Sequence, residues 1–231
     1  MNKKQIINEE LLKSIESKYV FSNSPINRIK SELNSTDIKA QLEVLKSKIA
    51  NIENCELKNN SKNLVFGDGN IKSKLMIIGE GPGEKEDNLG KPFVGDAGNL
   101  LNKMLTAINL ERKNVYITNV VNFRPPNNRK PTTAEINRYS EFLTEHILLI
   151  NPKILVIMGS TAMEALVGKN MKISKERGCW KEVIIRNKTY LSIVTFHPAY
   201  LLRQPDQKKY SWSDLKEIRK KIDTLNINLY Q

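Results

Sequence analysis

Four short apolar runs recur along this chain from about residue 55 onward. Between them lie stretches in which apolar residues recur every three or four positions, as on one face of a helix. Alternation of this kind predicts right-handed crossovers and a parallel sheet covered by helices on both faces. The expected fold class is therefore α/β. The predicted strands span residues 74–78, 115–118, 154–158 and 191–196, and the predicted helices span 97–108, 133–150, 160–167 (beginning with a Ser-Thr cap) and 213–222.

The first 50 residues differ from the rest, because they are rich in Lys, Glu, Asn and Ser. Two helical patterns cover residues 8–19 and 36–49, with a Ser-Asn-Ser-Pro break at residues 22–25. The second pattern places Ile38, Leu42, Leu45 and Ile49 on one face. We expect residues 1–50 to form an extension that either packs on the main domain as helices or is partly disordered. Residues 51–231 are expected to form the main domain.

The charge balance restricts the partner. Lys and Arg number 37 against 25 Asp and Glu, which gives a net charge of +12. Such a surplus favours a polyanion, with nucleic acid ahead of a membrane surface. Two cysteines exclude a disulfide-stapled secreted domain, and no apolar run is long enough to span a bilayer. We expect a cytoplasmic protein that associates with the nucleoid through DNA.

The polar and Gly/Pro-rich segments all follow predicted strands, and so they fall on one rim of the predicted sheet. Ligands of open α/β sheets bind at that rim, beyond the carboxyl ends of the strands. The first loop matches neither phosphate-binding glycine motif, which disfavours an ATP or dinucleotide site. The segments read GEGPGEKED and GKPFVG after the first strand, NVVNFRPPNNR after the second, GST after the third and HPAYLLR after the fourth.

Three residues of these loops suit the binding of a nucleic-acid base. Phe93 lies away from any apolar periodicity and could stack on a base, or it could anchor its loop in the core. The amide of Asn119 can match a pyrimidine edge, or it can stabilise a loop. His197 directly follows a strand and could donate to a developing oxyanion, or it could pack under the Pro198 turn. The other histidine, His146, is interpreted as structural.

The loop after the fourth strand continues with two leucines and an arginine. Apolar residues beside a cation suit insertion into a base stack, and ordinary packing is the alternative. Leu201, Leu202 and Arg203 are therefore candidate DNA contacts. Arg124 and Arg129 are further candidates for phosphate contacts.

Together, GEGPGEKED, GKPFVGDAGNLL, YITNVVNFRPPNNRKP, NPKILVIMGSTA and HPAYLLR resemble the family 4 uracil-DNA glycosylases, in order and from about residue 55 to 223. The resemblance implies an α/β/α domain with a four-stranded, mostly parallel central sheet. It also implies excision of uracil from single- or double-stranded DNA, which leaves an abasic site. We expect a monofunctional enzyme, since the resemblance gives no lysine a role in the site, and a monomer.

The resemblance also implies roles for individual residues. Glu80 and Gly81 would belong to the uracil pocket and the water-activating region, with Glu80 only a candidate general base. Glu86 would lie near the C5 edge and help to exclude the thymine methyl group. The remaining implied site residues are Phe93, stacked on uracil, Asn119, at its polar edge, Asn128, a second functional asparagine, and His197, bonded to uracil O2.

The chain departs from this family at the cluster that the family usually carries. A 4Fe-4S cluster needs thiolate ligands, and the family supplies four cysteines. Here Cys55 matches one ligand position, while Ile52, Phe123 and Tyr139 stand at or near the other three. We expect no cofactor, with these three side chains filling the vacated space. Two alternatives are a DNA-binding relative of reduced activity and a small-molecule hydrolase on the same fold.

Overall fold

The computed structural model describes residues 35–229, so the predicted helix over residues 8–19 and the break at 22–25 lie outside the described residues. The strands are β1 (Asp68–Gly69), β2 (Leu75–Gly79), β3 (Tyr116–Asn119), β4 (Ile154–Met158), β5 (Trp180–Ile185) and β6 (Lys188–Thr195). The helices are α2 (Ser35–Ala50), α3 (Glu56–Asn59), α4 (Glu84–Leu89), α5 (Asp96–Thr106), α6 (Thr133–Ile150), α7 (Ser160–Leu166), α8 (Ile173–Glu176), α9 (Pro198–Arg203) and α10 (Lys208–Thr224). Short 3₁₀ turns are η1 (Arg112–Asn114), η2 (Pro126–Asn128) and η3 (Pro205–Gln207).

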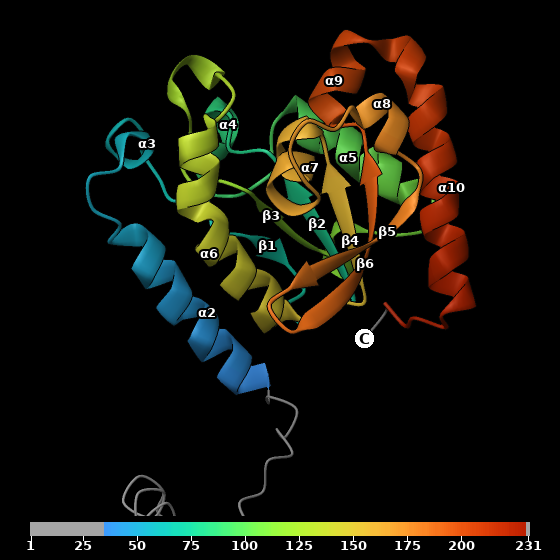
Figure 1. Ribbon diagram of the computed structural model, residues 1–231, viewed down its shortest axis with the longest axis horizontal. Coiled ribbons are helices and arrows are strands. Elements are labelled where there is room, and N and C mark those ends of the chain that lie inside the picture. Colours follow the sequence, from blue (N-terminus) through green and yellow to red (C-terminus); the bar gives the residue numbers. More distant parts are fainter. Residues whose placement is uncertain (1–34, 230–231) are drawn as a thin grey trace, which may run out of the picture. The chain divides into compact units, whose positions relative to one another are not determined.

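Within the described residues, one six-stranded sheet has the order β1-β3-β2-β4-β6-β5 (Figure 1). The four predicted strands form its parallel centre, while β1 and β5 are antiparallel edge strands. Both edge strands escaped the sequence analysis for physical reasons. β1 has two residues, and β5 alternates buried with exposed side chains because only one of its faces meets the core.

The central strands are apolar at every position because helices cover both faces of the sheet. In β2, Met76 and Ile78 pack on the side of α2, α6 and α7. Leu75 and Ile77 pack on the side of α5, α9 and α10. Successive side chains of a strand point to opposite faces, and so a continuous apolar run satisfies two cores at once. The predicted three-layer α/β/α architecture is confirmed.

The helix α2 belongs to the first of these cores. Leu42, Leu45 and Ile49 are buried there, and α2 lies against α6. The predicted apolar face of the second N-terminal helix is therefore confirmed, and this helix packs on the main domain. The domain boundary at residue 50 stays a prediction. No helix among residues 35–229 is long and apolar enough to cross a bilayer.

Candidate active site

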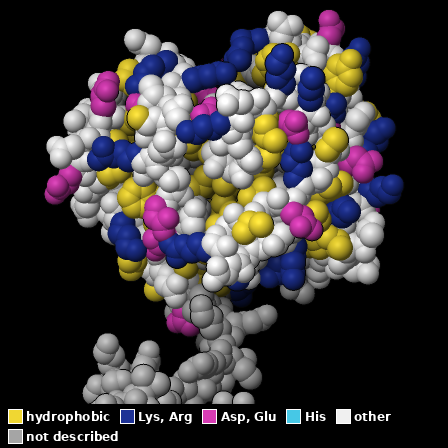
Figure 2. Space-filling view, in the orientation of Figure 1, with side chains coloured by type: hydrophobic (Ala, Val, Ile, Leu, Met, Phe, Trp, Pro, Cys, Tyr) yellow, Lys and Arg dark blue, Asp and Glu magenta, His cyan; other side chains and the backbone are white. Residues whose placement is uncertain are grey.

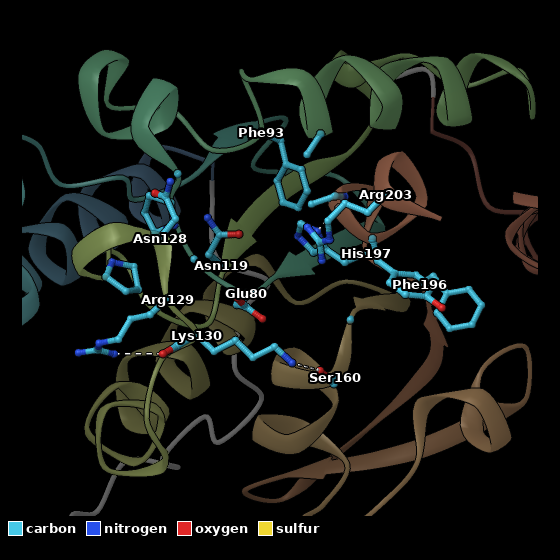
Figure 3. A pocket seen from close by; sticks show the side chains of 18 of the residues that line it. Glu80, Phe93, Asn119, Asn128, Arg129, Lys130, Ser160, Phe196, His197 and Arg203 are labelled. Atoms are coloured by element: carbon cyan, nitrogen blue, oxygen red, sulfur yellow. Dashed lines mark hydrogen bonds between the residues drawn. The ribbon is translucent and has the colours of Figure 1, made fainter. Parts of the chain in front are cut away.

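A cavity of about 800 Å³ opens where the loops after β2 and β4 diverge toward opposite faces of the sheet. The chain turns from β2 toward α4 and α5, and from β4 toward α7. This divergence marks the topological switch point at which open α/β sheets bind ligands. Loops after all four parallel strands line the cavity, as the sequence predicted (Figure 3).

Phe93 projects into this cavity from a strained loop. Its backbone has a φ of 51°, which is uncommon for a residue other than glycine. Two groups hold the loop in place. The guanidinium of Arg112 donates to the carbonyl of Phe93 at 2.9 Å, and Oε1 of Glu86 accepts from the N–H groups of Val94 and Gly95 at 2.9 and 2.8 Å. The ring is thereby fixed at the cavity, although its side chain is also largely buried.

Asn119 ends β3 beside the ring of Phe93 (Figure 3). The residue is 3% exposed, and its Oδ1 has no hydrogen-bond partner in the described part of the chain. A buried acceptor without a partner costs about 1–3 kcal/mol. Gly79 makes room for both side chains, since a Cβ there would lie 2.5 Å from Asn119 Oδ1 and from the Phe93 ring. A ligand that donates a hydrogen bond to Asn119 Oδ1 would therefore recover this free-energy cost.

His197 lines the same cavity beside Phe93, and the centroids of the two rings lie 5.3 Å apart in a tilted contact. Its Nδ1 accepts a hydrogen bond from the N–H of Ala199 at 3.2 Å, so the neutral ring carries its proton on Nε2. Burial, together with the nearby charge of Arg203, lowers the pKa of His197 from 6.5 to about 4. At neutral pH the residue is therefore an uncharged donor.

Glu80 lines the cavity and accepts a hydrogen bond from the hydroxyl of Thr161. This contact joins the loop after β2 to the first turn of α7. It also corrects the predicted Ser-Thr cap, because the N-cap of α7 is Gly159, whose φ of 94° suits glycine. Sequence reasoning missed Thr161, although its place directly after a rim loop was a usable signal. Gly81 lines the same wall, where a Cβ would approach Val121 to 2.8 Å.

The loop 125–130 also lines the cavity, and its Pro125 lies close to Gly81. Asn128 has a φ of 55°, and its Oδ1 accepts from Nε of Arg124 at 2.8 Å, which leaves Nδ2 as the donor end of the amide. Arg129 pairs with Glu135 through two contacts of 2.7 and 2.8 Å, so its charge is largely balanced. Lys130 also lines the cavity, a residue that the sequence analysis passed over.

Of the three residues predicted to meet DNA in α9, Leu201 was assigned wrongly. Leu201 is 1% exposed and lies in the core with α5 and α10, because residues three apart in a helix share a face and Pro198 also faces inward. Leu202 is 44% exposed, and Arg203 lines the cavity. These two stay candidates for DNA contact. His146 is buried and hydrogen-bonds Tyr116 at 2.9 Å, which confirms its structural role.

The residues at the four cluster positions do not form an iron–sulfur site. Sγ of Cys55 lies 3.4 Å from the hydroxyl of Tyr139, with both residues buried. Phe123 is 5% exposed, and Ile52 packs against the same core. A single thiol among a phenol and two apolar side chains lacks the donors that such a cluster needs.

Comparison with known proteins agrees with this geometry. Residues 66–216 match the model of the uracil DNA glycosylase superfamily. A type-4 uracil-DNA glycosylase of Thermotoga maritima is 43% identical over 163 residues, which cover 70% of this chain and 83% of the relative. One of Sulfurisphaera tokodaii is 41% identical over 77% of this chain and 83% of the relative. A type-5 uracil-DNA glycosylase of Pyrobaculum aerophilum is 31% identical over 43% of this chain and 50% of its own length.

Proposed function

Since this chain belongs to the uracil DNA glycosylase superfamily, we propose that it excises uracil from DNA by hydrolysing the N-glycosidic bond. The observation that carries the proposal is one cavity holding an aromatic ring, a buried unpaired amide oxygen and a neutral histidine donor. Phe93, Asn119 and His197 supply these three groups. A flipped base needs stacking and hydrogen bonds to its edges, which this set offers.

Recognition of uracil rests on Asn119. Its unpaired Oδ1 matches the N3–H donor of uracil, while cytosine carries a lone pair at the same position and would leave the oxygen unsatisfied. Sites that hydrogen-bond a substrate reject analogues that leave such groups unpaired. We assign stacking on the base to Phe93. Glu86, fixed by two backbone N–H groups, stays our candidate for excluding the thymine methyl group.

Bond cleavage moves negative charge onto the leaving base. The N1–C1′ bond breaks, its electron pair goes to uracil, and the sugar becomes oxocarbenium-like. Nε2–H of His197 donates to uracil O2, where much of the charge collects. Water then adds at C1′ and loses a proton, which completes the hydrolysis. We propose that Asn128 and the backbone around Gly81 help to hold the reacting groups.

Glu80 is our candidate for orienting the attacking water, and Thr161 is the residue that positions its carboxylate. Thr161→Val keeps the side-chain shape but removes the donor, and so we expect single-turnover excision about tenfold slower, because hydrogen bonds to charged groups contribute about 1.5–3 kcal/mol. Thr161→Ser keeps the donor and should stay near the wild-type rate. Equal rates for Thr161→Val and wild type would contradict this role.

The substrate is uracil-containing DNA, single- or double-stranded, and the protein acts as a monomer in the cytoplasm. Arg203 and Leu202 are our candidates for contacting the strand at the cavity mouth, with Arg124 behind Asn128. Arg129 is a weaker candidate because Glu135 balances its charge. Phosphate contacts by a chain of net charge +12 offset the cost of base flipping, so affinity should fall steeply with salt.

A gel assay tests the function itself. A uracil-containing oligonucleotide is incubated with the protein and then treated with alkali, which cleaves at abasic sites. We expect cleavage only after alkali and only with uracil present. Cleavage without alkali would indicate a lyase. Lys130 is the residue to suspect in that case, because it lines the cavity with its Nζ 3.4 Å from the hydroxyl of Ser160.

We also propose that the chain works without an iron–sulfur cluster. The Cys55–Tyr139 contact and the burial of Phe123 support this, since the space is packed by side chains. Purified protein should hold no stoichiometric iron or sulfide, and Cys55→Ser should leave excision unchanged within about twofold, because a lone thiol holds no cluster. Stoichiometric iron that is lost in Cys55→Ser would overturn the proposal.

A further inference from the structure

A second groove lies between α10 and the end of α5, apart from the active-site cavity. It has a volume of about 440 Å³ and is lined by Trp212, Lys216 and Lys220 of α10 and by residues 107–109. Four exposed residues of α10 follow one another at intervals of four, and so they share one side of the helix. We name them the α10 stripe: Lys208, Trp212, Lys216 and Lys220.

The stripe combines an aromatic surface with unbalanced positive charge. Trp212 is 44% exposed, a large ring left in water. The acidic residue that lines the groove, Asp223, is paired with Arg219, which lies on the same helix. The lysines therefore give the groove a net positive charge. Figure 2 shows Lys and Arg side chains interspersed with hydrophobic ones along the edge that α10 forms in Figure 1.

We propose that the α10 stripe binds single-stranded DNA flanking the nucleotide that enters the active site. This combination matches the surfaces that hold single strands, on which bases stack on aromatic rings while cations follow the phosphates. A base would stack on Trp212, and Lys216 and Lys220 would contact the neighbouring phosphates. The proposal rests on the proposed function, because it takes the same DNA as its ligand.

The path from the cavity to the stripe is short and continuous along the chain. Gln207 lines the active-site cavity and immediately precedes α10. From Gln207 to Lys220 the helix rises about 20 Å at about 1.5 Å per residue, a span that a few extended nucleotides can bridge. The superfamily match ends at residue 216, within α10, so Lys220 lies beyond the matched segment.

Two oligonucleotides separate the stripe from the catalytic site. One has the uracil with a single nucleotide on each side and reaches only the cavity, and the other has about thirty nucleotides and reaches the stripe. Trp212→Ala should lower kcat/KM for the long substrate at least about fivefold and leave the short one unchanged, because stacking on one base contributes about 1–3 kcal/mol. Lys216→Gln with Lys220→Gln should reduce the slope of log kcat/KM against log salt by about 1.4 for the long substrate alone.

The matched control removes the same charge from the opposite helical layer. Lys39→Gln with Lys46→Gln lies on α2, across the sheet from α10, and should leave the ratio of long to short kcat/KM at the wild-type value. Equal losses in the control and stripe variants, or no loss in either, would overturn the proposal. If wild-type protein excises uracil from neither oligonucleotide, the proposed function is refuted instead.

Fluorescence tests the stripe without any reaction. The chain has two tryptophans, and Trp180→Phe leaves Trp212 as the only one. A uracil-free single strand of about thirty nucleotides should quench that emission in a salt-dependent manner, since stacking places a base on the ring. Absence of quenching under conditions of DNA binding would overturn the proposal. Stronger quenching by polyglutamate than by DNA would overturn it too, and would assign the groove to an acidic protein.

Discussion

His197→Ala should lower uracil excision by about 10²–10³, because loss of one donor to a developing oxyanion typically costs that much. The donor is Nε2–H of a neutral imidazole. The N–H of Ala199 donates to Nδ1, which leaves the ring proton on Nε2, and burial of the ring keeps His197 uncharged. Single-turnover rates on a uracil-containing oligonucleotide measure the effect. DNA affinity should fall only modestly, since our proposal has His197 contact the base and not the phosphates.

The unfolding midpoint of His197→Ala provides the control. A variant that melts near the wild-type temperature but loses excision has lost a catalytic group and not its fold. Excision at the wild-type rate would contradict the assignment of His197.

The pH profile gives a second check on the same residue. Because its pKa is about 4 in the folded chain, His197 stays neutral from pH 8 down to about pH 5. Excision should therefore show no step near pH 6.5, where an exposed histidine titrates.

The free energy of unfolding, in contrast, should depend on pH in this range. The unfolded chain takes up protons below about pH 6.5 that half-buried His197 and buried His146 do not, so unfolding becomes easier between about pH 6.5 and pH 4.

Asp214→Ala should destabilise the fold by about 3–5 kcal/mol, the usual cost of removing one partner of a buried ion pair. Asp214 is 1% exposed, pairs with Arg177 and accepts from the Thr195 hydroxyl at 2.7 Å. Asp214 lies in α10, and its loss leaves the guanidinium of Arg177 without its carboxylate partner. The unfolding midpoint should fall by about 6–20 °C, as expected for a domain of this size.

Excision should fall as well, because this pair lies behind the strand end that carries His197. Thr195 is two residues before His197, and Arg177 lies over the ring of Phe196 at 5.6 Å. Asp214→Asn keeps the shape and the acceptor, so it should recover much of the lost stability. A midpoint for Asp214→Ala within about 2 °C of wild type would show that water or another group replaces the carboxylate.

The central sheet was predictable because it depends on local sequence. A strand covered on both faces must be apolar at every position, and β4 coincides with its predicted residues for that reason. The rim location of the site followed in turn, since parallel strands direct all their carboxyl ends to one edge. Phe93, Asn119 and His197 do line one cavity there.

Side-chain partners were not predictable in the same way. Leu201 and Leu202 are neighbours of the same type, yet one is in the core and the other is exposed. Only the rotation of α9 against α5 and α10 decides between them. The contact between Thr161 and Glu80 joins residues 81 positions apart, so a local pattern could place each residue at the rim but could not pair the two.

By itself the sequence determined the α/β class, the rim that carries the site and the residues able to bind a base, because strand periodicity and loop chemistry are local properties. The tertiary structure alone decided which atoms of those residues are engaged. Among residues 35–229 it left Asn119 Oδ1 without a hydrogen-bond partner, fixed the proton of His197 on Nε2 and closed the space around Cys55 with Tyr139. These outcomes depend on contacts between distant segments, which form only when the layers pack.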